Sequence, residues 1–342
     1  MSRELVILFP DFFSFASEGK RSGSHFSRSY ESVFTSFFSY SGQYEGYEKE
    51  LLDVFGLKAE RSSVQSSLIN ILATNDLEDN DENVILRADP VYLKADQNRV
   101  FLFDGQALAI DNGEAEEILG ELNDLYSDEL FYFTMGKKPW RWYLRRSGHN
   151  PPEGYSPLTL RGSPLEVAET ERQNLGKLKT LLTEVQMILH ASSINEVRTG
   201  RNVLPINSLW FWGYERSPKN YSYKTRKSIL ITNCDLAQNI ARDARMSWID
   251  LEVFNENEFE DVKADGLIII DPTEFESLRS FLEKILINLF AQIRTGTLRR
   301  VRLITRLGHF RVTPLSRLKF WKRRTEFLEA TNRQSEMGDQ LF

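Results

Sequence analysis

Two residues near the middle of the chain carry side chains suited to holding an anion. Asn195 and Arg198 stand three positions apart and offer amide and guanidinium donors, the groups that bind carboxylates and phosphates. The structural alternative is that both side chains cap and buttress a turn that follows a helix. We predict both as ligand-binding residues, with the buttressing role as the alternative.

A second candidate pair lies earlier in the sequence. Arg87 and Asp89 are separated by one residue and stand directly before Pro90. An Arg-x-Asp pair can position an anion, and it can equally form a structural salt bridge at the end of a strand. We predict Arg87 and Asp89 as anion-binding candidates and leave the salt bridge open.

Three further candidates follow Arg198. Asn207, Trp210 and Trp212 lie in a segment with the alternation of a β-strand, so the two tryptophans share one face. Tryptophans on a shared face either contact a ligand or pack against a helix. Both roles stay open, and these three residues complete the predicted ligand-binding set.

The composition fits a folded globular protein in a reducing compartment. Of the 342 residues, 41% are apolar and 27% are charged. Cys234 is the only cysteine, which excludes an internal disulfide and a cysteine-based metal cluster within one chain. The apolar run at residues 5–9 is too short for a signal peptide or a membrane span. We therefore expect a cytoplasmic protein without a membrane span.

The net charge of −6 hides an uneven distribution. Residues 76–129 are rich in Asp and Glu, whereas residues 285–324 contain eleven Lys or Arg and no acidic residue. The basic segment suits phosphate, an anionic membrane surface or nucleic acid, and it can equally pair with the acidic half of the protein. No helix-turn-helix, zinc module or glycine-rich phosphate loop accompanies it, so we do not expect nucleic-acid binding.

Strands and helices must position these candidates, and the apolar periodicity predicts both. Short aliphatic or aromatic runs indicate strands, and apolar residues at i, i+3, i+4 and i+7 indicate helices. The predicted strands are 5–9, 84–86, 91–93, 99–103, 140–144, 209–212, 228–232, 248–253, 267–270, 299–305 and 309–312. The predicted helices are 47–55, 64–72, 113–126, 177–189, 235–245, 274–293 and 316–330. This alternation predicts an α/β fold with a mixed or largely parallel sheet flanked by helices.

Three passages carry a family resemblance: RADPVYL from Arg87, RWYLR from Arg141, and LTEVQMILHASSINEVRTGRNVLPINSLWFWG from Leu182. Together they resemble the RpfE-type regulatory proteins, which are themselves similar to archaeal-type cofactor-independent phosphoglycerate mutases. In the mutases a His-Pro-x-Asn-x-x-Arg segment leads to an Asn-x-x-Trp-x-Trp-Gly segment. The residues of this chain that fall on that pattern are Asn195, Arg198, Asn207, Trp210, Trp212 and Gly213.

The resemblance implies an alkaline phosphatase-like α/β fold and a bacterial regulatory protein. In mutases of that superfamily a serine forms a phosphoryl-enzyme, and two divalent metals held by Asp and His neutralise charge. None of the four histidines stands in the family's metal-binding settings, and Arg306-Leu307-Gly308-His309 replaces an expected Asp-His. The glycine-rich metal loop near Asp11 is also missing. We therefore predict no catalytic residue, no bound metal and no cofactor.

The predicted organisation is an α/β core interrupted by a smaller region. Residues 1–83 form the N-terminal part of the core, residues 84–215 an inserted α+β region with the mutase-like motifs, and residues 216–342 the C-terminal part with a basic terminal helix. The predicted function is a non-catalytic regulatory protein, a pseudoenzyme that binds a small phosphorylated or carboxylate ligand or a protein partner. The alternative is a metal-dependent phosphoglycerate mutase or phosphohydrolase with a rearranged site, using carboxylates such as Asp11, Asp89, Asp104 and Asp271.

Overall fold

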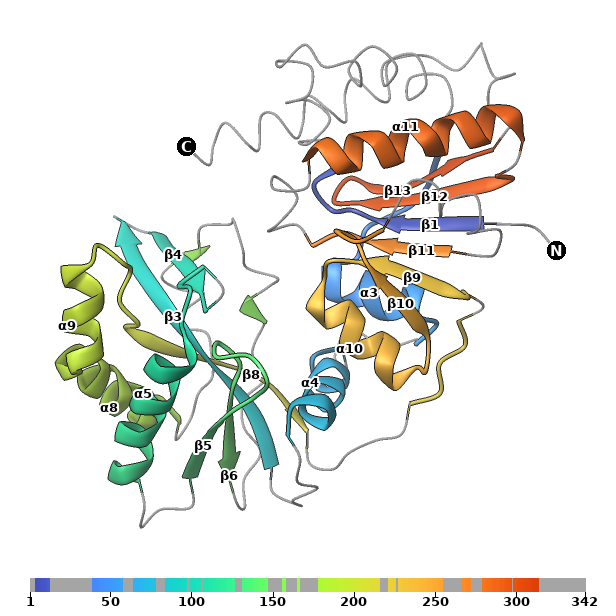
Figure 1. Ribbon diagram of the computed structural model, residues 1–342. Helices are drawn as coiled ribbons and strands as arrows, with labels where there is room; N and C mark the ends of the chain where they lie inside the picture. The colour runs from blue at the N-terminus through green and yellow to red at the C-terminus, as the bar shows by residue number, and fades with distance from the viewer. Residues whose placement is uncertain are drawn as a thin grey trace. The chain divides into compact units, whose positions relative to one another are not determined.

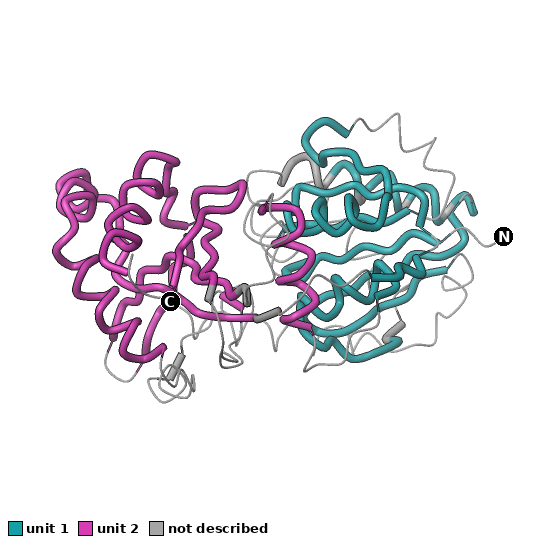
Figure 2. Tube along the Cα trace, turned by 90° about the horizontal axis from the view of Figure 1, so that it is seen from below, with its two compact units in different colours: residues 1–58, 221–342 teal, residues 59–220 magenta. Residues whose placement is uncertain are grey.

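The structure is a computed structural model that describes residues 4–12, 39–57, 64–77, 84–96, 99–105, 107–126, 131–146, 156–157, 165–166, 178–215, 221–225, 227–254, 266–271, 279–296 and 298–313 (Figure 1). The predicted terminal helix at residues 316–330 lies outside this part of the chain. The chain divides into two compact units, one of residues 1–58 and 221–342 and one of residues 59–220 (Figure 2). We refer to them as the split unit and the inserted unit.

The split unit is built on a sheet that, in the described part of the chain, has seven strands. Their order is β10 (Ser247–Asp250), β9 (Ile229–Thr232), β11 (Gly266–Ile269), β1 (Glu4–Leu8), β12 (Arg300–Thr305), β13 (Gly308–Val312) and β2 (Ser39–Gly42). The first five strands run parallel, and β13 pairs antiparallel with both β12 and β2. The predicted α/β class with a mixed, largely parallel sheet is confirmed.

Aliphatic sequence explains why the centre of this sheet is buried on both faces. β1 reads ELVIL, and its last four residues are at most 3% exposed. Such continuous apolar runs are typical of strands in parallel sheets, because helices cover both faces. Leu5 and Ile7 belong to a hydrophobic cluster that also contains three residues of α11 (Arg279–Thr295), namely Ile285, Leu289 and Ile293.

The helical connections leave the sheet on opposite faces. α10 (Asp235–Asp243) joins β9 to β10 on one side, whereas α11 joins β11 to β12 on the other side, beyond β1. Since crossovers between parallel strands are right-handed in nearly all proteins, the two helices cover opposite faces. The change of direction falls between the neighbouring strands β9 and β11. In open α/β sheets, ligands bind at such a switch point, outside the carboxyl ends of the strands.

The inserted unit is built on an antiparallel sheet. Its strand order is β5 (Phe131–Met135), β6 (Trp142–Arg146), β3 (Val84–Asp96), β4 (Arg99–Asp104) and β7 (Leu165–Glu166), and β8 (Ser208–Glu215) also pairs with β3. β6 and β4 share one edge of β3, while β8 runs along the other edge. The predicted strands at 84–86 and 91–93 are therefore one strand. Pro90 is tolerated inside it because it lies where the shared edge changes from β6 to β4.

Two helices cover one face of this antiparallel sheet. α5 (Asn112–Leu125) and α8 (Leu178–Ala191) each present an apolar stripe with helical spacing, and both stripes join one hydrophobic cluster with the sheet. α5 begins with a capping box, in which Asp111 accepts from the Glu114 amide and Glu114 accepts from the Asp111 amide. α9 (Ser193–Gly200) begins two residues after α8 ends.

α4 (Val64–Asp76) marks a difference from the predicted segment boundaries. The prediction assigned this helix to the N-terminal part of the core, whereas α4 packs against β8 and belongs to the inserted unit. The approach is close, because a Cβ on Gly213 of β8 would lie 2.3 Å from Ile69 Cγ1. Gly213 also has a φ of +56°, so both the backbone conformation and the packing of α4 require glycine there.

Candidate functional site

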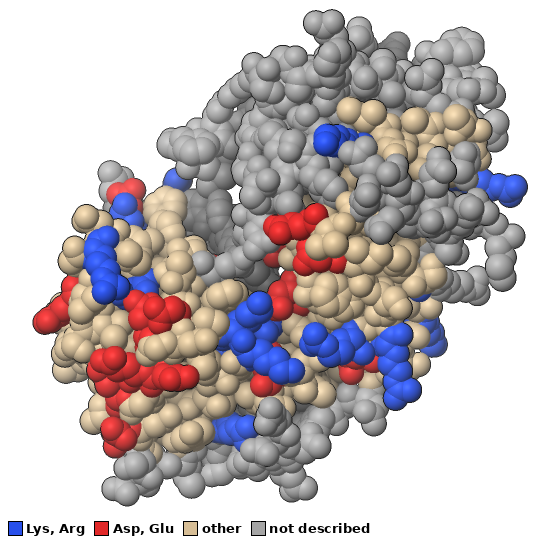
Figure 3. Space-filling view, viewed as in Figure 1, with Lys and Arg blue, Asp and Glu red and all other residues tan. Residues whose placement is uncertain are grey.

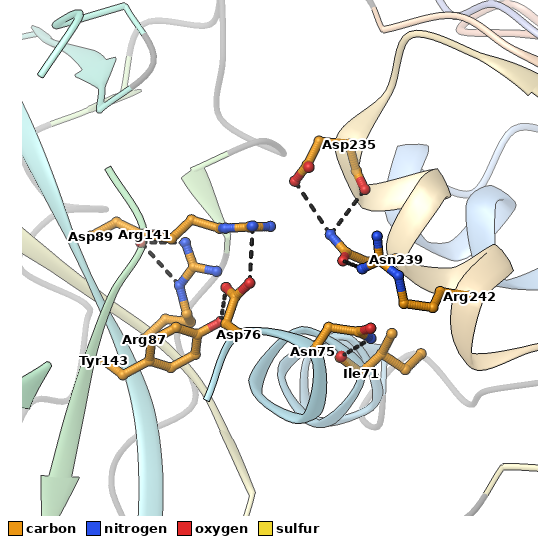
Figure 4. Close-up of polar contacts among 10 residues, drawn as sticks. All are labelled: Ile71, Asn75, Asp76, Arg87, Asp89, Arg141, Tyr143, Asp235, Asn239 and Arg242. Carbon is orange, nitrogen blue, oxygen red and sulfur yellow. Dashed lines mark hydrogen bonds and ion pairs between the residues drawn. The ribbon is translucent and has the colours of Figure 1, made fainter. Parts of the chain in front are cut away.

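The two faces of the antiparallel sheet differ in polarity. Leu86 and Ala88 belong to the core under α5 and α8, so Arg87 and Asp89, which alternate with them along β3, point to the opposite face. The same alternation in β6 and β8 brings further polar side chains to this second face. The resulting group, which we call the Arg87 cluster, comprises Asp76, Arg87, Asp89, Arg141, Tyr143 and Trp212. Figure 4 shows all its members except Trp212.

Arg87 and Asp89 form a buried ion pair in this cluster. Arg87 Nε donates to Asp89 Oδ1 at 3.0 Å, its Nη2 also contacts that oxygen, and Trp212 Nε1 donates to Asp89 Oδ2 at 2.6 Å. Burial raises the pKa of the Asp89 carboxyl, and Arg87 and Trp212 oppose that shift. Burial works against the charge of Arg87, but Asp89, Tyr143 and Asp76 together outweigh it and the pKa of Arg87 is raised. These contacts are those of the structural salt bridge, the alternative reading of the pair.

The Arg87 guanidinium also lies over two aromatic rings. Its Cζ is 5.0 Å from the ring centroid of Tyr143 and 5.3 Å from that of Trp212. Cation–π contacts of this kind strengthen when the groups are desolvated, as they are here. The face that Trp210 and Trp212 share therefore also carries Arg87 and Asp89. In the register of β8 against β3, Trp212 pairs with Arg87 and Trp210 with Asp89.

Asp76, the last residue of α4, completes the cluster. Tyr143 Oη donates to Asp76 Oδ2 at 2.7 Å, and Arg141 Nη2 lies 2.9 Å from Asp76 Oδ1. Burial raises the pKa of Tyr143, so its hydroxyl keeps its proton and remains a donor. Asp76 and Tyr143 are not among the predicted ligand-binding residues. The alternation Trp142-Tyr143-Leu144 signals that Tyr143 points to the face opposite to that of Trp142 and Leu144. Nothing local signals its partner, which is 67 residues away.

The side chain of Asn195 forms its hydrogen bonds with backbone groups of the same chain. Its Nδ2 donates to the Leu189 carbonyl at 2.6 Å and to the Ile206 carbonyl at 2.7 Å, and its Oδ1 accepts from the Ile206 amide at 2.8 Å. Both amide protons are therefore used. The side chain ties the end of α8 to the segment that enters β8, which is the buttressing role named as the alternative.

Arg198 has a similar position and is 2% exposed. Its Nε donates to the Leu204 carbonyl at 2.9 Å, its Nη2 to the Leu108 carbonyl at 2.5 Å, and its Nη1 to Glu114 Oε2 at 2.6 Å. The guanidinium thus connects α9, the loop after it and the start of α5. Whether Asn195 and Arg198 also bind a ligand stays a prediction, and such a ligand would compete with these contacts.

Asn207 imitates a strand residue with its side chain. Asn207 Nδ2 donates to the Leu93 carbonyl at 2.9 Å, and Oδ1 accepts from the Leu93 amide at 2.8 Å. The side-chain amide therefore extends the pairing of β3 and β8 by one step beyond Val91, which accepts from the Asn207 backbone amide at 3.1 Å. Its role as a ligand-binding residue likewise stays a prediction.

The split unit brings polar residues to the carboxyl ends of its parallel strands. Asn233 and Cys234 follow β9, Asp271 follows β11, and the Asp271 amide donates to Asn233 Oδ1 at 2.9 Å across the switch point. Asp11 follows β1, and Arg306 follows the neighbouring strand β12. This edge is the candidate functional site of the fold, because switch points of α/β sheets are where ligands bind.

Asp11 and Arg306 form an ion pair at this edge. Arg306 Nε donates to Asp11 Oδ1 at 2.8 Å, and Nη2 lies 3.5 Å from Oδ2. The Arg306 amide donates to the Pro10 carbonyl at 3.1 Å, so the pairing of β1 and β12 fixes both residues. Asp11, one of the carboxylates named for the enzymatic alternative, is thus paired with a cation.

His309 ends the Arg306–His309 segment, which replaces an expected Asp-His of the mutases. In the structure it contacts α3 (Tyr47–Val54). Its Nε2 lies 2.7 Å from Glu50 Oε1, and Glu50 also accepts from the Glu45 amide at 3.1 Å. The ring packs against Gly42 of β2, where a Cβ would lie 3.3 Å from Nδ1. His309 therefore links β13 to α3 and β2.

Cys234 lies buried beside Tyr47 at the start of α10. Its Sγ is 3.1 Å from Tyr47 Oη. Burial raises the pKa of the thiol to about 12, and the nearby Asp271 shifts it in the same direction. The thiol is therefore neutral at physiological pH and is not activated as a nucleophile.

The native Cys234 thiol is expected to react with iodoacetamide about a thousandfold more slowly at about pH 8 than the thiol of the unfolded chain. The reason is that raising the pKa from 9.0 to about 12 lowers the thiolate fraction by roughly that factor. Mass spectrometry of timed samples measures both rates, with protein unfolded in guanidinium as the control. Equal rates in the two states would contradict the buried position.

Among the described residues, no group of three or more His, Cys, Asp or Glu side chains is arranged to hold a metal ion. Of the four carboxylates named for the enzymatic alternative, Asp11 pairs with Arg306 and Asp89 with Arg87. Asp104 accepts from the Ala107 amide at 3.1 Å in the turn after β4. The residues present in this part of the chain do not fit a two-metal site of the mutase kind.

The described surface gives two further observations. On the face shown in Figure 3, the described residues expose both acidic and basic side chains. No helix within the described residues is long and apolar enough to cross a membrane.

Comparisons with known proteins give matches to solved structures alone. No protein-family model and no curated protein matches the chain. Similar solved structures include the cofactor-independent phosphoglycerate mutase of Thermoplasma acidophilum, at 14% identity and a TM-score of 0.37, and the PH0037 protein of Pyrococcus horikoshii, at 10% identity and a TM-score of 0.42. Both matches cover 91% of this chain, and they cover 89% and 87% of the respective neighbours. With TM-scores below 0.5, neither match says anything about activity.

Proposed function

We propose that this chain is a non-catalytic regulatory protein, an RpfE-type relative of the phosphoglycerate mutases whose metal site has been lost. The observation that carries the proposal is the ion pair between Asp11 and Arg306 at the carboxyl ends of β1 and β12. A mutase would need carboxylates and imidazoles at this edge to hold two divalent ions. Here the retained carboxylate is neutralised by a guanidinium.

The guanidinium of Arg306 stays protonated at any ordinary pH. Burial by itself lowers the pKa of Arg306, but the adjacent Asp11 and the nearby Tyr44 together outweigh this effect and the pKa is raised. A divalent ion bound by Asp11 would therefore lie within a few ångströms of a fixed positive charge, which repels it. The arrangement favours a protein that does not bind metal at this edge.

In this proposal the protein regulates by binding rather than by catalysing a reaction. The resemblance implies a bacterial protein, and we expect it in the cytoplasm. A phosphorylated or carboxylate ligand at Asn195 and Arg198 would have to displace hydrogen bonds that hold α8, α9 and β8 in place. Displacing such bonds leaves buried carbonyl groups without donors, which costs about 1 to 3 kcal/mol for each group. We therefore favour a protein partner that binds elsewhere on the surface over a small anion bound at these residues.

The test is an assay for metal and for mutase activity on the purified full chain. We expect no stoichiometric Mn²⁺ or Mg²⁺ after dialysis, no thermal shift on adding either ion, and no interconversion of 2- and 3-phosphoglycerate. An established cofactor-independent mutase serves as the positive control.

A different outcome would support the enzymatic alternative. Metal-dependent interconversion that falls in the variants Asp11→Asn and Asp271→Asn, but not in the variant Asp124→Asn, would overturn the proposal. Asp124 is an exposed carboxylate of α5 in the inserted unit, so it controls for the loss of one negative charge.

A further inference from the structure

β10 forms an edge of the seven-stranded sheet (Figure 1). Within the described residues it pairs only with β9, and its first two residues are exposed, with Trp248 at 38%. An edge strand presents a row of N–H and C=O groups that can pair with a further strand. An exposed tryptophan on such an edge adds a large apolar surface to that potential partner site.

Within the described residues, β10 carries few of the devices that usually prevent pairing. The sequence of β10, Ser-Trp-Ile-Asp, has no proline and no lysine, and its charged residue, Asp250, accepts from the Glu252 amide at 2.9 Å. Its pairing with β9 runs without a register shift over all four residues. Nothing in the strand itself therefore opposes the addition of a partner strand.

Residues of opposite charge flank the two ends of β10. Arg245 stands two residues before the first residue of the strand, and Glu252 stands two residues after the last. Both side chains are exposed. A strand that is basic at one end and acidic at the other is complementary to an antiparallel copy of itself, because each basic end then meets an acidic end.

We propose that β10 is the contact strand of a two-fold symmetric dimer, in which the β10 strands of two copies of this chain pair antiparallel. A two-fold axis perpendicular to a continuous sheet keeps each residue on its own face, so directly opposite residues must have the same parity. The register that places Trp248 opposite Trp248 of the second copy meets this condition. The chain turns just beyond both ends of the strand, so the register brings the Arg245 end of one copy towards the Glu252 end of the other without a ladder pairing of these two residues.

The expected dimer is weak. A four-residue strand edge alone buries less than the 1,200 to 2,000 Å² or so that stable interfaces usually bury. The tryptophan pair and two symmetric charge contacts supply most of its specificity. Association should therefore depend on protein concentration and weaken as salt increases. This inference is independent of the proposed regulatory function.

Sedimentation velocity of the full chain over a wide concentration range tests the proposal. We expect reversible dimerisation that becomes about tenfold weaker in the variant Arg245→Glu, about tenfold weaker in Glu252→Arg, and at least tenfold weaker in Trp248→Ser. The double variant Arg245→Glu/Glu252→Arg should recover most of the affinity, because the charge complementarity is restored with reversed signs. A loss of folding in either single variant could not produce that recovery.

A matched control removes an exposed aromatic residue elsewhere. Tyr132 of β5 in the inserted unit is 57% exposed, so the variant Tyr132→Ser should leave dimerisation unchanged. A chain that stays monomeric at all concentrations would overturn the proposal. A dimer that ignores both charge reversals and the Trp248 substitution would overturn it as well, because another surface would then form the interface.

Discussion

Replacing Asp89 with alanine is expected to lower the free energy of unfolding of the inserted unit by about 3 to 5 kcal/mol. The substitution leaves the guanidinium of Arg87 buried without its carboxylate, and Trp212 Nε1 loses its acceptor. Arg87 is only 4% exposed, so water cannot replace the lost partner without opening the cluster. Removing one member of a buried ion pair is among the most destabilising single changes.

Urea unfolding followed by tryptophan fluorescence measures this effect. The exposed Asp124→Ala variant is the control, and its free energy of unfolding should change by less than about 0.5 kcal/mol. The double variant Arg87→Met/Asp89→Leu should recover much of the loss, since it removes both charges together. A cost for Asp89→Ala no greater than that of the control would mean that the pair is not buried as described.

The second large effect is expected for Arg198. Replacing it with methionine keeps the long apolar stem but removes bonds to the Leu108 carbonyl, the Leu204 carbonyl and the Glu114 carboxylate. Hydrogen bonds that involve a charged group contribute about 1.5 to 3 kcal/mol each, and they are not fully additive. We expect a loss of about 3 to 4 kcal/mol in the free energy of unfolding.

Arg201 offers a matched control near the same helix end. It is exposed, and Arg201→Met should change the free energy of unfolding by less than about 0.5 kcal/mol. The comparison also separates the two roles that the sequence left open for Arg198. If Arg198→Met unfolds no more easily than Arg201→Met, the buttressing contacts are not its main role, and ligand binding becomes the better explanation.

The class of the fold could be predicted because its signal is local. The aliphatic runs that became β1, β9, β11 and β12 are buried strands whether or not their neighbours are known. The stripes of α5 and α8 follow the helical period in the same way. The errors fell where tertiary pairing decides: β3 runs through Pro90 because β6 and β4 pair with it on either side of that residue.

The candidate residues show a similar division. Alternation placed Trp210 and Trp212 on one face, and the register of β8 against β3 agrees with that. The chemical groups of Asn195, Arg198 and Asn207 were also evident, but a donor is equally suited to a backbone carbonyl and to a ligand. Only the structure shows that the side-chain amides of Asn195 and Asn207 donate their hydrogen bonds to backbone carbonyls. The accepting carbonyls are those of Leu189, Ile206 and Leu93.

By itself the sequence determined most of the helices and strands that form and the faces that they bury, because these follow from periodicity and residue type. The tertiary structure alone decided the partner of each polar side chain. Asp11 and Arg306 are 295 residues apart in the chain and Asp76 and Tyr143 are 67 apart, yet each pair is within hydrogen-bond distance. Hydrogen bonds and ion pairs act over about 3 Å, so they depend on how distant segments meet in space. Residue spacing along the chain does not predict which distant segments come into contact.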